Sequence, residues 1–156
     1  MSKIKENSGV LVQGHIKIHD PESGAVFVNK RNAIHYENMS IALAESVANQ
    51  GQGFISSMAF GNGGTSVDPT GIITYLTPNS TGTNASLYNQ TFTKIVDDRS
   101  VSNLDPQRNK IETRHVNGTN YTDVVVTCLL DYGEPNGQDA TAVSYTHLTL
   151  PTTVRV

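Results

Sequence analysis

Four groups of residues have side chains that could take part in catalysis or metal binding. They are the histidines His15 and His19, the glycine run at residues 61–64, the aspartates Asp97, Asp98 and Asp105, and the single cysteine Cys128. The same residue types also occur on solvated surfaces, in turns and in apolar cores. Each group therefore has to be judged from its place in the chain.

The two histidines lie in residues 10–19, where apolar and polar side chains alternate and predict a strand. Residues four apart on a strand are separated by roughly 13 Å, which is too far for both imidazoles to bind one zinc ion. We therefore expect His15 and His19 to be surface residues.

The glycine run has the glycine density of a phosphate-binding loop but lacks its Gly-Lys-Ser/Thr sequence, and the predicted helix precedes its strand. We interpret Gly61, Gly63 and Gly64 as a turn that requires positive φ angles. Cys128 lies between apolar neighbours, so we expect a buried thiol with a raised pKa that does not act as a nucleophile.

The aspartates do not have the spacing of an EF-hand, and paired acids at the end of a strand are usually solvated. No Ser/His/Asp or Cys/His arrangement is recognisable. Two basic spots, Lys30 with Arg31 and Arg108 with Lys110, are interpreted as solvated faces or salt-bridge donors. The sequence thus predicts no catalytic, cofactor-binding or metal-binding residues and favours a non-enzymatic protein.

Length, charge and composition narrow the class of protein further. The chain has 156 residues, a net charge of -3 and scattered Lys and Arg residues, which fits one domain and disfavours nucleic-acid binding. We expect no export signal and no membrane segment, because no apolar run has the required length. One cysteine suits a reducing compartment. Abundant Thr, Asn and Gly, with 16% charged residues, indicate a loop-rich β protein.

The segment at residues 33–65 organises these features, because it combines one helix, a glycine break, a buried strand and the glycine-rich turn. We predict a helix from Glu37 to Asn49, with Glu37 or Asn38 serving its first turn and Gly51 with Gly53 ending it. Its apolar face has helical spacing and should be covered by a sheet; it consists of Met39, Leu43 and Val47.

Alternation and apolar runs predict seven further strands or short strand segments. They lie at residues 10–19, 25–29, 54–60, 72–76, 91–97, 110–116 and 123–130. Residues 20–24 and the pair Asn117-Gly118 predict hairpin turns, and residues 123–130 are predicted as a central strand. The expected fold class is α+β, mainly antiparallel β in a sandwich-like sheet of six or seven strands with one packed helix.

We divide the chain into a flexible N-terminus at residues 1–9, a single β-rich domain at residues 10–142, and a terminal segment at residues 143–156. The run VSYTHLTLPT resembles the translation of a sequencing-library adapter. We therefore interpret Val143 to about Thr153 as non-native, the domain as incomplete at its C-terminus, and the free edge of residues 123–130 as prone to aggregation.

Four longer motifs indicate a family. They are VNKRNAIHYENMS at residues 28–40, MAFGNGGT at 58–65, VDPTGIITYL at 67–76 and TCLLDYGEP at 127–135. Together they resemble an uncharacterised type of virion structural protein from marine tailed bacteriophages, of the contractile-tailed cyanophage type. The resemblance implies a tail, baseplate or neck component that is made in the host bacterial cytoplasm and located in the virion. It implies assembly with other virion proteins and with copies of itself, without a cofactor, nucleic acid or a membrane.

An alternative function is a receptor- or glycan-binding module of a phage fibre. We expect residues 77–86 to be an exposed polar loop with little to bury, and Tyr75, Tyr88 and Tyr121 would supply aromatic contact surface. A hydrolase acting on the host envelope is a third hypothesis, which no acid/base pair supports.

Overall fold

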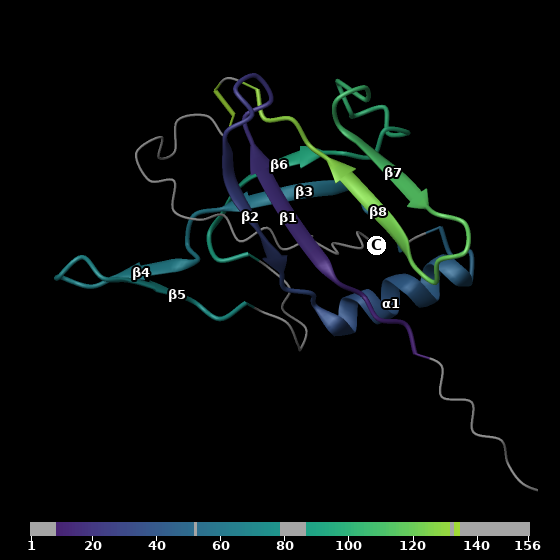
Figure 1. Cartoon of the computed structure of the whole chain (residues 1–156), viewed down its shortest axis with the longest axis horizontal. Helices are drawn as coiled ribbons and strands as arrows, with labels where there is room; N and C mark the ends of the chain where they lie inside the picture. Colours follow the sequence, from purple (N-terminus) through teal and green to yellow (C-terminus); the bar gives the residue numbers. More distant parts are fainter. Residues whose placement is uncertain (1–8, 52, 79–86, 132, 135–156) are drawn as a thin grey trace, which may run out of the picture.

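Figure 1 shows the computed structural model of the chain, which describes residues 9–51, 53–78, 87–131 and 133–134. The described elements are β1 (Gly14–His19), β2 (Val26–Asn32), α1 (Tyr36–Val47), β3 (Ser57–Gly61), β4 (Thr65–Val67), β5 (Ile73–Tyr75), β6 (Gln90–Ile95), β7 (Lys110–His115) and β8 (Thr122–Thr127). The predicted class is confirmed: the fold is α+β, with antiparallel strands and one helix among the described residues.

Within the described chain, the strands form four separate antiparallel pairs rather than one continuous sheet. The pairs are β1–β2, β3–β6, β4–β5 and β7–β8. The prediction of a central strand at residues 123–130 is wrong, because β8 is shorter and pairs with β7 alone. The strand β4 was not predicted. The described strands therefore number eight, and each has one edge without a strand partner from the described chain.

Three of the four pairs enclose one hydrophobic core. Figure 1 shows β3 and β6 crossing behind β1, β2 and β8, so that the pairs form two layers. Ile16 from β1, Met58 and Phe60 from β3, and Val96 after β6 are buried between them. Each contributes on the order of 1.5 to 3 kcal/mol through burial. None of the described core residues comes from β4 or β5.

The helix α1 is capped differently from the prediction. His35 is the N-cap, and its Nδ1 accepts a hydrogen bond from the backbone N–H of Asn38 at 3.2 Å. At the other end, Asn49 has a positive φ of 55°. The Gln50 N–H donates to the Glu45 carbonyl and the Asn49 N–H to the Ser46 carbonyl, which is a Schellman motif. His35 and Asn49 thus cap the helix. The predicted Glu37 lies in its first turn, whereas Gly51 and Gly53 have positive φ angles but follow the Asn49 stop.

The face of α1 that was predicted to pack on a sheet is largely exposed. Leu43 is 40% exposed and Val47 is 89% exposed, whereas Ala42 is the buried residue of the helix. The prediction of a covered Leu43 and Val47 is therefore wrong. Regular spacing shows that a helix has an apolar stripe, but it does not show that the same chain covers the stripe.

Two further predictions concern the ends of the chain and membranes. Residues 1–8 and 135–156, which include Val143 to Thr153, lie outside the described residues, so the structure does not test their interpretation. Within the described residues, no helix has the length and apolar character that are needed to cross a bilayer.

Candidate functional site

One exposed part of the described fold is a hairpin that we call the arm, residues 64–76, built from β4 and β5. Figure 1 shows it extending away from the layered body. In its register Thr65 lies opposite Tyr75, and Val67 lies opposite Ile73. Because directly opposed residues share a face, these four side chains form one face and Ser66 with Thr74 form the other. The arm is therefore amphipathic.

The apolar face of the arm is open to solvent. Val67 is 62% exposed, Ile73 is 50% exposed and Tyr75 is 51% exposed. The neighbouring Ile72 is also exposed. Burying these side chains against another surface would be favourable, since apolar burial releases about 25 cal/mol per Å².

The tip of the arm is held by Asp68. Its carboxylate accepts hydrogen bonds from the Thr70 hydroxyl, the Thr70 N–H and the Ile72 N–H, at 2.6, 2.8 and 3.0 Å. The Thr70 hydroxyl and then the Ile72 N–H lower the pKa of Asp68, so the tip carries a negative charge at neutral pH. Gly71 closes the turn with a φ of +85°. The arm thus has a defined shape and one charge.

The chain segments that lead into and out of the arm are joined by backbone hydrogen bonds. We call this junction, residues 62–63 and 88–89, the closed neck of the arm. The Asn62 N–H donates to the Asn89 carbonyl and the Gly63 N–H to the Tyr88 carbonyl, both at 3.2 Å. Gly61 and Gly63 do not have positive φ angles, so this part of the turn prediction is wrong. Glycine is needed for a different reason: a Cβ on Gly61 would lie 2.7 Å from the Tyr88 carbonyl oxygen.

One cation of the body contacts the base of the arm. The Lys30 ammonium, on β2, lies 5.9 Å from the centre of the Tyr75 ring. A cation at this distance from an aromatic face is attracted by the ring quadrupole. Lys30 is exposed, in agreement with the predicted solvated face, and it also contacts the base of the arm.

The solvent side of the β1–β2 pair is a second exposed surface, which we call the outer face. His15, Lys17 and Arg31 point away from the core, because the alternate residues Ile16 and Ile18 pack into it. His15 donates to Asn29 at 2.7 Å, and His19 is also exposed, as predicted. A bulge at one end adds Val26 and Phe27, 51% and 65% exposed. The outer face is thus basic with an apolar end.

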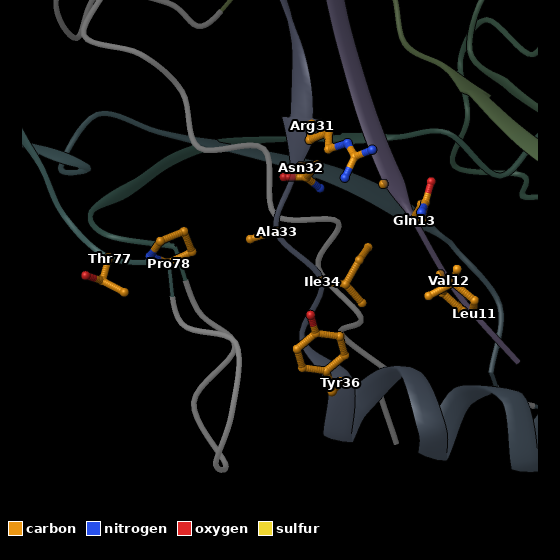
Figure 2. Close-up of a pocket in the computed structure, with 11 residues that line it drawn as sticks. Leu11, Val12, Gln13, Arg31, Asn32, Ala33, Ile34, Tyr36, Thr77 and Pro78 are labelled. Atoms are coloured by element: carbon orange, nitrogen blue, oxygen red, sulfur yellow. The ribbon is translucent and has the colours of Figure 1, made fainter. Parts of the chain in front are cut away.

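A pocket of about 440 Å³ lies beside the outer face, between the start of β1 and the start of α1. Figure 2 shows Thr77 and Pro78 on one side of it, Leu11 and Val12 on the other, and Arg31 above Ile34 and Tyr36. The other lining residues are Gln13, Gly14, Asn32 and Ala33, so Arg31 supplies the one charged side chain. This lining suits an amide or a carboxylate more than acid–base chemistry.

The predicted acidic group does not converge on a ligand. Asp97 is buried and pairs with Arg99 at 3.2 Å, while Asp98 is exposed. Desolvation opposes ionisation of Asp105, but hydrogen bonds from Arg108 lower its pKa below the ordinary value. Among the described residues, no cluster of three or more His, Cys, Asp or Glu side chains could hold a metal ion.

Two asparagines that the sequence did not single out anchor the loop around these acids. Asn109 is 1% exposed, and its Oδ1 accepts the Leu129 N–H at 2.8 Å. Asn103 is also buried and donates to the Asp97 and Asn109 carbonyls at 3.1 and 2.8 Å. Buried polar groups that are satisfied in this way fix a loop in one conformation. Their role here is structural.

Cys128 lies near an ion-pair cluster at the end of β6. Cys128 is half-buried rather than fully buried as predicted, and this burial raises the pKa of its thiol to about 11, in the predicted direction. Lys94 pairs with Glu134 and, at 3.3 Å, with Asp131. Desolvation lowers the pKa of Lys94, but these carboxylates outweigh it and raise the pKa above its ordinary value. The cluster joins β6 to the chain after β8, and the thiol stays protonated at neutral pH.

The three tyrosines proposed for glycan contact do not form one surface. Tyr75 lies in the arm, and the Tyr88 hydroxyl donates to the Thr77 carbonyl at 2.8 Å. Tyr121 precedes β8, and Figure 1 shows the start of β8 on the opposite side of the molecule from the arm. Of the polar loop at residues 77–86, only residues 77 and 78 belong to the described chain.

Two of the exposed surfaces of the described chain combine several side chains of one kind. They are the apolar face of the arm and the basic outer face. A scan against protein-family models and searches of curated proteins and of solved structures found no match to this chain.

Proposed function

We propose that this chain is a non-enzymatic virion structural protein of a tailed bacteriophage, in the tail, baseplate or neck. It acts by assembling with other virion proteins and with copies of itself. It is synthesised in the host bacterial cytoplasm and is located in the virion. The phage-like motifs at residues 28–40, 58–65, 67–76 and 127–135 support the class of particle.

The observation that carries the proposal is the uncovered apolar face of the arm. An isolated two-stranded hairpin is marginally stable in water, and soluble proteins rarely leave contiguous apolar surface without a partner. Val67, Ile73 and Tyr75 are each at least half exposed on one face of such a hairpin. In an assembly, a neighbouring protein would cover this apolar face, and its burial would stabilise the contact between them.

The helix offers a second surface of the same kind. Tyr36, Leu43 and Val47 are 67%, 40% and 89% exposed. Their spacing of seven and four residues places them on one side of α1. A particle component with neighbours on several sides would bury both the arm and this stripe.

The test is to look for the chain in particles of the phage that encodes it. Particles are purified on a density gradient and their proteins are identified by mass spectrometry, with an abundant host cytoplasmic protein as the contamination control. We expect peptides of this chain at a fixed ratio to a tail protein and depletion of the host protein. Particles that are infectious and free of the chain would refute the proposal.

A glycan array separates the alternative function from this one. Binding of the purified chain to a defined surface glycan, lost in a Tyr75→Ala variant, would favour a receptor-binding module of a fibre. The proposed assembly role predicts no glycan binding and no loss of particle association in a fibre-less mutant.

A further inference from the structure

We infer that the arm of one copy docks on the outer face of the β1–β2 pair of a second copy, so that copies join head to tail. The arm is residues 64–76, and the outer face consists of His15, Lys17, Val26, Phe27 and Arg31. The inference deepens the proposed assembly role and rests on it.

The first step is that the arm needs a partner from outside its own chain. All three residues of β5 are exposed, and none of the described core residues comes from the arm. At the base of the arm, the Leu76 N–H donates to the Gly64 carbonyl at 3.0 Å and closes the hairpin, and Lys30 of the body contacts Tyr75. Beyond this base, the side chains of Val67 and Ile73 are exposed to solvent, and a second surface could cover them.

The second step is that the outer face has matching groups. Val26 and Phe27 are exposed apolar side chains at its bulged end. Lys17 and Arg31 are exposed, and neither makes an ion pair within the described chain. The face can therefore cover an apolar strand and receive a carboxylate without breaking an existing pair.

The third step is charge complementarity, which selects this contact over an arm-to-arm contact. Residues 64–76 contain one acid, Asp68, and no Lys or Arg. The outer face carries Lys17 and Arg31, and the strands β1 and β2 contain no Asp or Glu. Two arms in contact would bring like charges together, whereas arm and outer face bring opposite charges together.

Because the two surfaces are different, the contact is heterologous. Each copy that uses its arm leaves its own outer face free for the next copy. Repetition gives a closed ring if the rotation closes and a filament if it does not.

The test uses the full chain and compares adjacent positions on opposite faces of β5. Ile73→Asp places a charge on the apolar face of the arm, and Thr74→Asp places the same charge on its polar face. Sedimentation velocity over a concentration series should show species larger than a dimer for the native chain and for Thr74→Asp. For Ile73→Asp the midpoint concentration of assembly should rise at least about tenfold, which corresponds to 1.4 kcal/mol of contact energy.

A mixing experiment tests the head-to-tail arrangement. Lys17→Glu alters the outer face and keeps the arm, whereas Ile73→Asp alters the arm and keeps the outer face. At a concentration where the native chain assembles and Ile73→Asp does not, each variant alone should stay monomeric, and an equimolar mixture should form dimers that do not grow further. Asp68→Asn keeps the oxygen that holds the turn and removes the charge, so it should weaken assembly without unfolding the arm.

Three results would overturn the inference. They are a native chain that stays monomeric at all concentrations, an Ile73→Asp variant that assembles like the native chain, and a mixture that forms no dimer although both variants keep the native unfolding midpoint. A monomeric chain that is still found in purified particles would remove this inference and leave the proposed function in place. Absence from particles would remove the proposed function whatever the chain does alone.

Discussion

The β1–β2 and β4–β5 hairpins share one turn chemistry and differ in what covers them. Both turns begin with Asp-Pro: Asp20 accepts hydrogen bonds from Ser23 and the Glu22 N–H, and Asp68 accepts from Thr70 and the Ile72 N–H. Both contain a glycine with positive φ, 73° at Gly24 and 85° at Gly71. One hairpin packs Ile16 and Ile18 into the core, while the other leaves Val67 and Ile73 exposed.

The comparison separates the shape of a hairpin from its stability. Turn residues and alternation specify where the chain reverses and which side chains share a face. Covering that face is what stabilises the hairpin, since a two-stranded pair alone is marginal. The β1–β2 pair finds its cover in the same chain, and we expect the arm to find it in another copy.

The largest effect should come from the same substitution in both hairpins. Ile16→Ala should lower the free energy of unfolding by about 2 to 5 kcal/mol, because Ile16 is 6% exposed and its loss leaves a cavity. Ile73→Ala should change it by less than about 0.5 kcal/mol. Urea unfolding of monomeric protein measures both. Equal losses would mean that the arm belongs to the cooperative core.

A smaller effect should come from the two turn glycines. An added Cβ at Gly24 or Gly71 meets nothing within 4 Å, so Ala costs only the left-handed backbone, about 1 to 2 kcal/mol. Gly24→Ala should lower the global unfolding midpoint, because the β1–β2 pair is part of the core. Gly71→Ala should leave this midpoint unchanged and speed amide exchange at Ile72 and Leu76. A shift of the unfolding midpoint in Gly71→Ala would show that the arm contributes to the stability of the core, which would contradict the comparison.

The next smaller effect should be a difference between the hairpins in how the unfolding midpoint depends on pH. Hydrogen bonds from Ser23 and then the Glu22 N–H lower the pKa of Asp20 in the folded state. Its stabilisation is therefore complete above the unfolded pKa of about 4 and is lost as the pH falls through the lower folded value. Asp20→Asn should flatten the fall in unfolding midpoint below pH 4, and Asp68→Asn should not. Circular dichroism melts at several pH values measure this.

The smallest effect should come from the terminal segment. If residues 143–156 are non-native, a chain that ends at residue 142 should keep the unfolding free energy of the full chain within about 0.5 kcal/mol. It should also assemble at the same concentration, because the proposed contact uses only the arm and the outer face. A clear loss of stability would show that the segment is part of the fold.

The sequence predicted the hairpins well where turn and alternation agree. Residues 20–24 and Asn117-Gly118 lie between the paired strands β1–β2 and β7–β8. The predicted first strand begins too early because Gly14 already pairs with Asn32, the last residue of β2. Val10 and Leu11 continue the alternation without a described partner strand and are more than 80% exposed. Alternation of apolar and polar residues shows which side chains share a face of a strand. Hydrogen-bonded pairing with another strand determines where the strand begins and ends.

The helix and the buried asparagines show that a sequence pattern does not determine which residues are buried in the fold. Met39, Leu43 and Val47 have the spacing of a packed face, yet the structure leaves Val47 in solvent. Asn103 and Asn109 lie in an aperiodic loop, where polar residues are ordinarily read as exposed. Their burial depends on carbonyl and amide groups brought together by β6, β7 and the chain after β8.

The candidate site was only partly visible in the sequence. A short strand at residues 72–76 was predicted, and β5 lies within it. Thr65–Val67 is three residues long and directly follows a glycine turn, so it gave no strand signal. The apolar face of the arm appears only when Val67 is paired with Ile73. The basic outer face likewise depends on the register that sets Arg31 opposite His15.

The closed neck has a consequence for how this protein can vary. Residues 62–89 leave and re-enter the body at adjacent points, held by the Asn62–Asn89 and Gly63–Tyr88 backbone hydrogen bonds. Doubling the length of a loop whose ends are already joined costs only about 0.6 kcal/mol in closure entropy. Insertions and deletions beyond the neck should therefore leave the β3–β6 pair intact. Such changes would alter the reach of the arm, and with it the spacing between neighbouring copies, while keeping the same body.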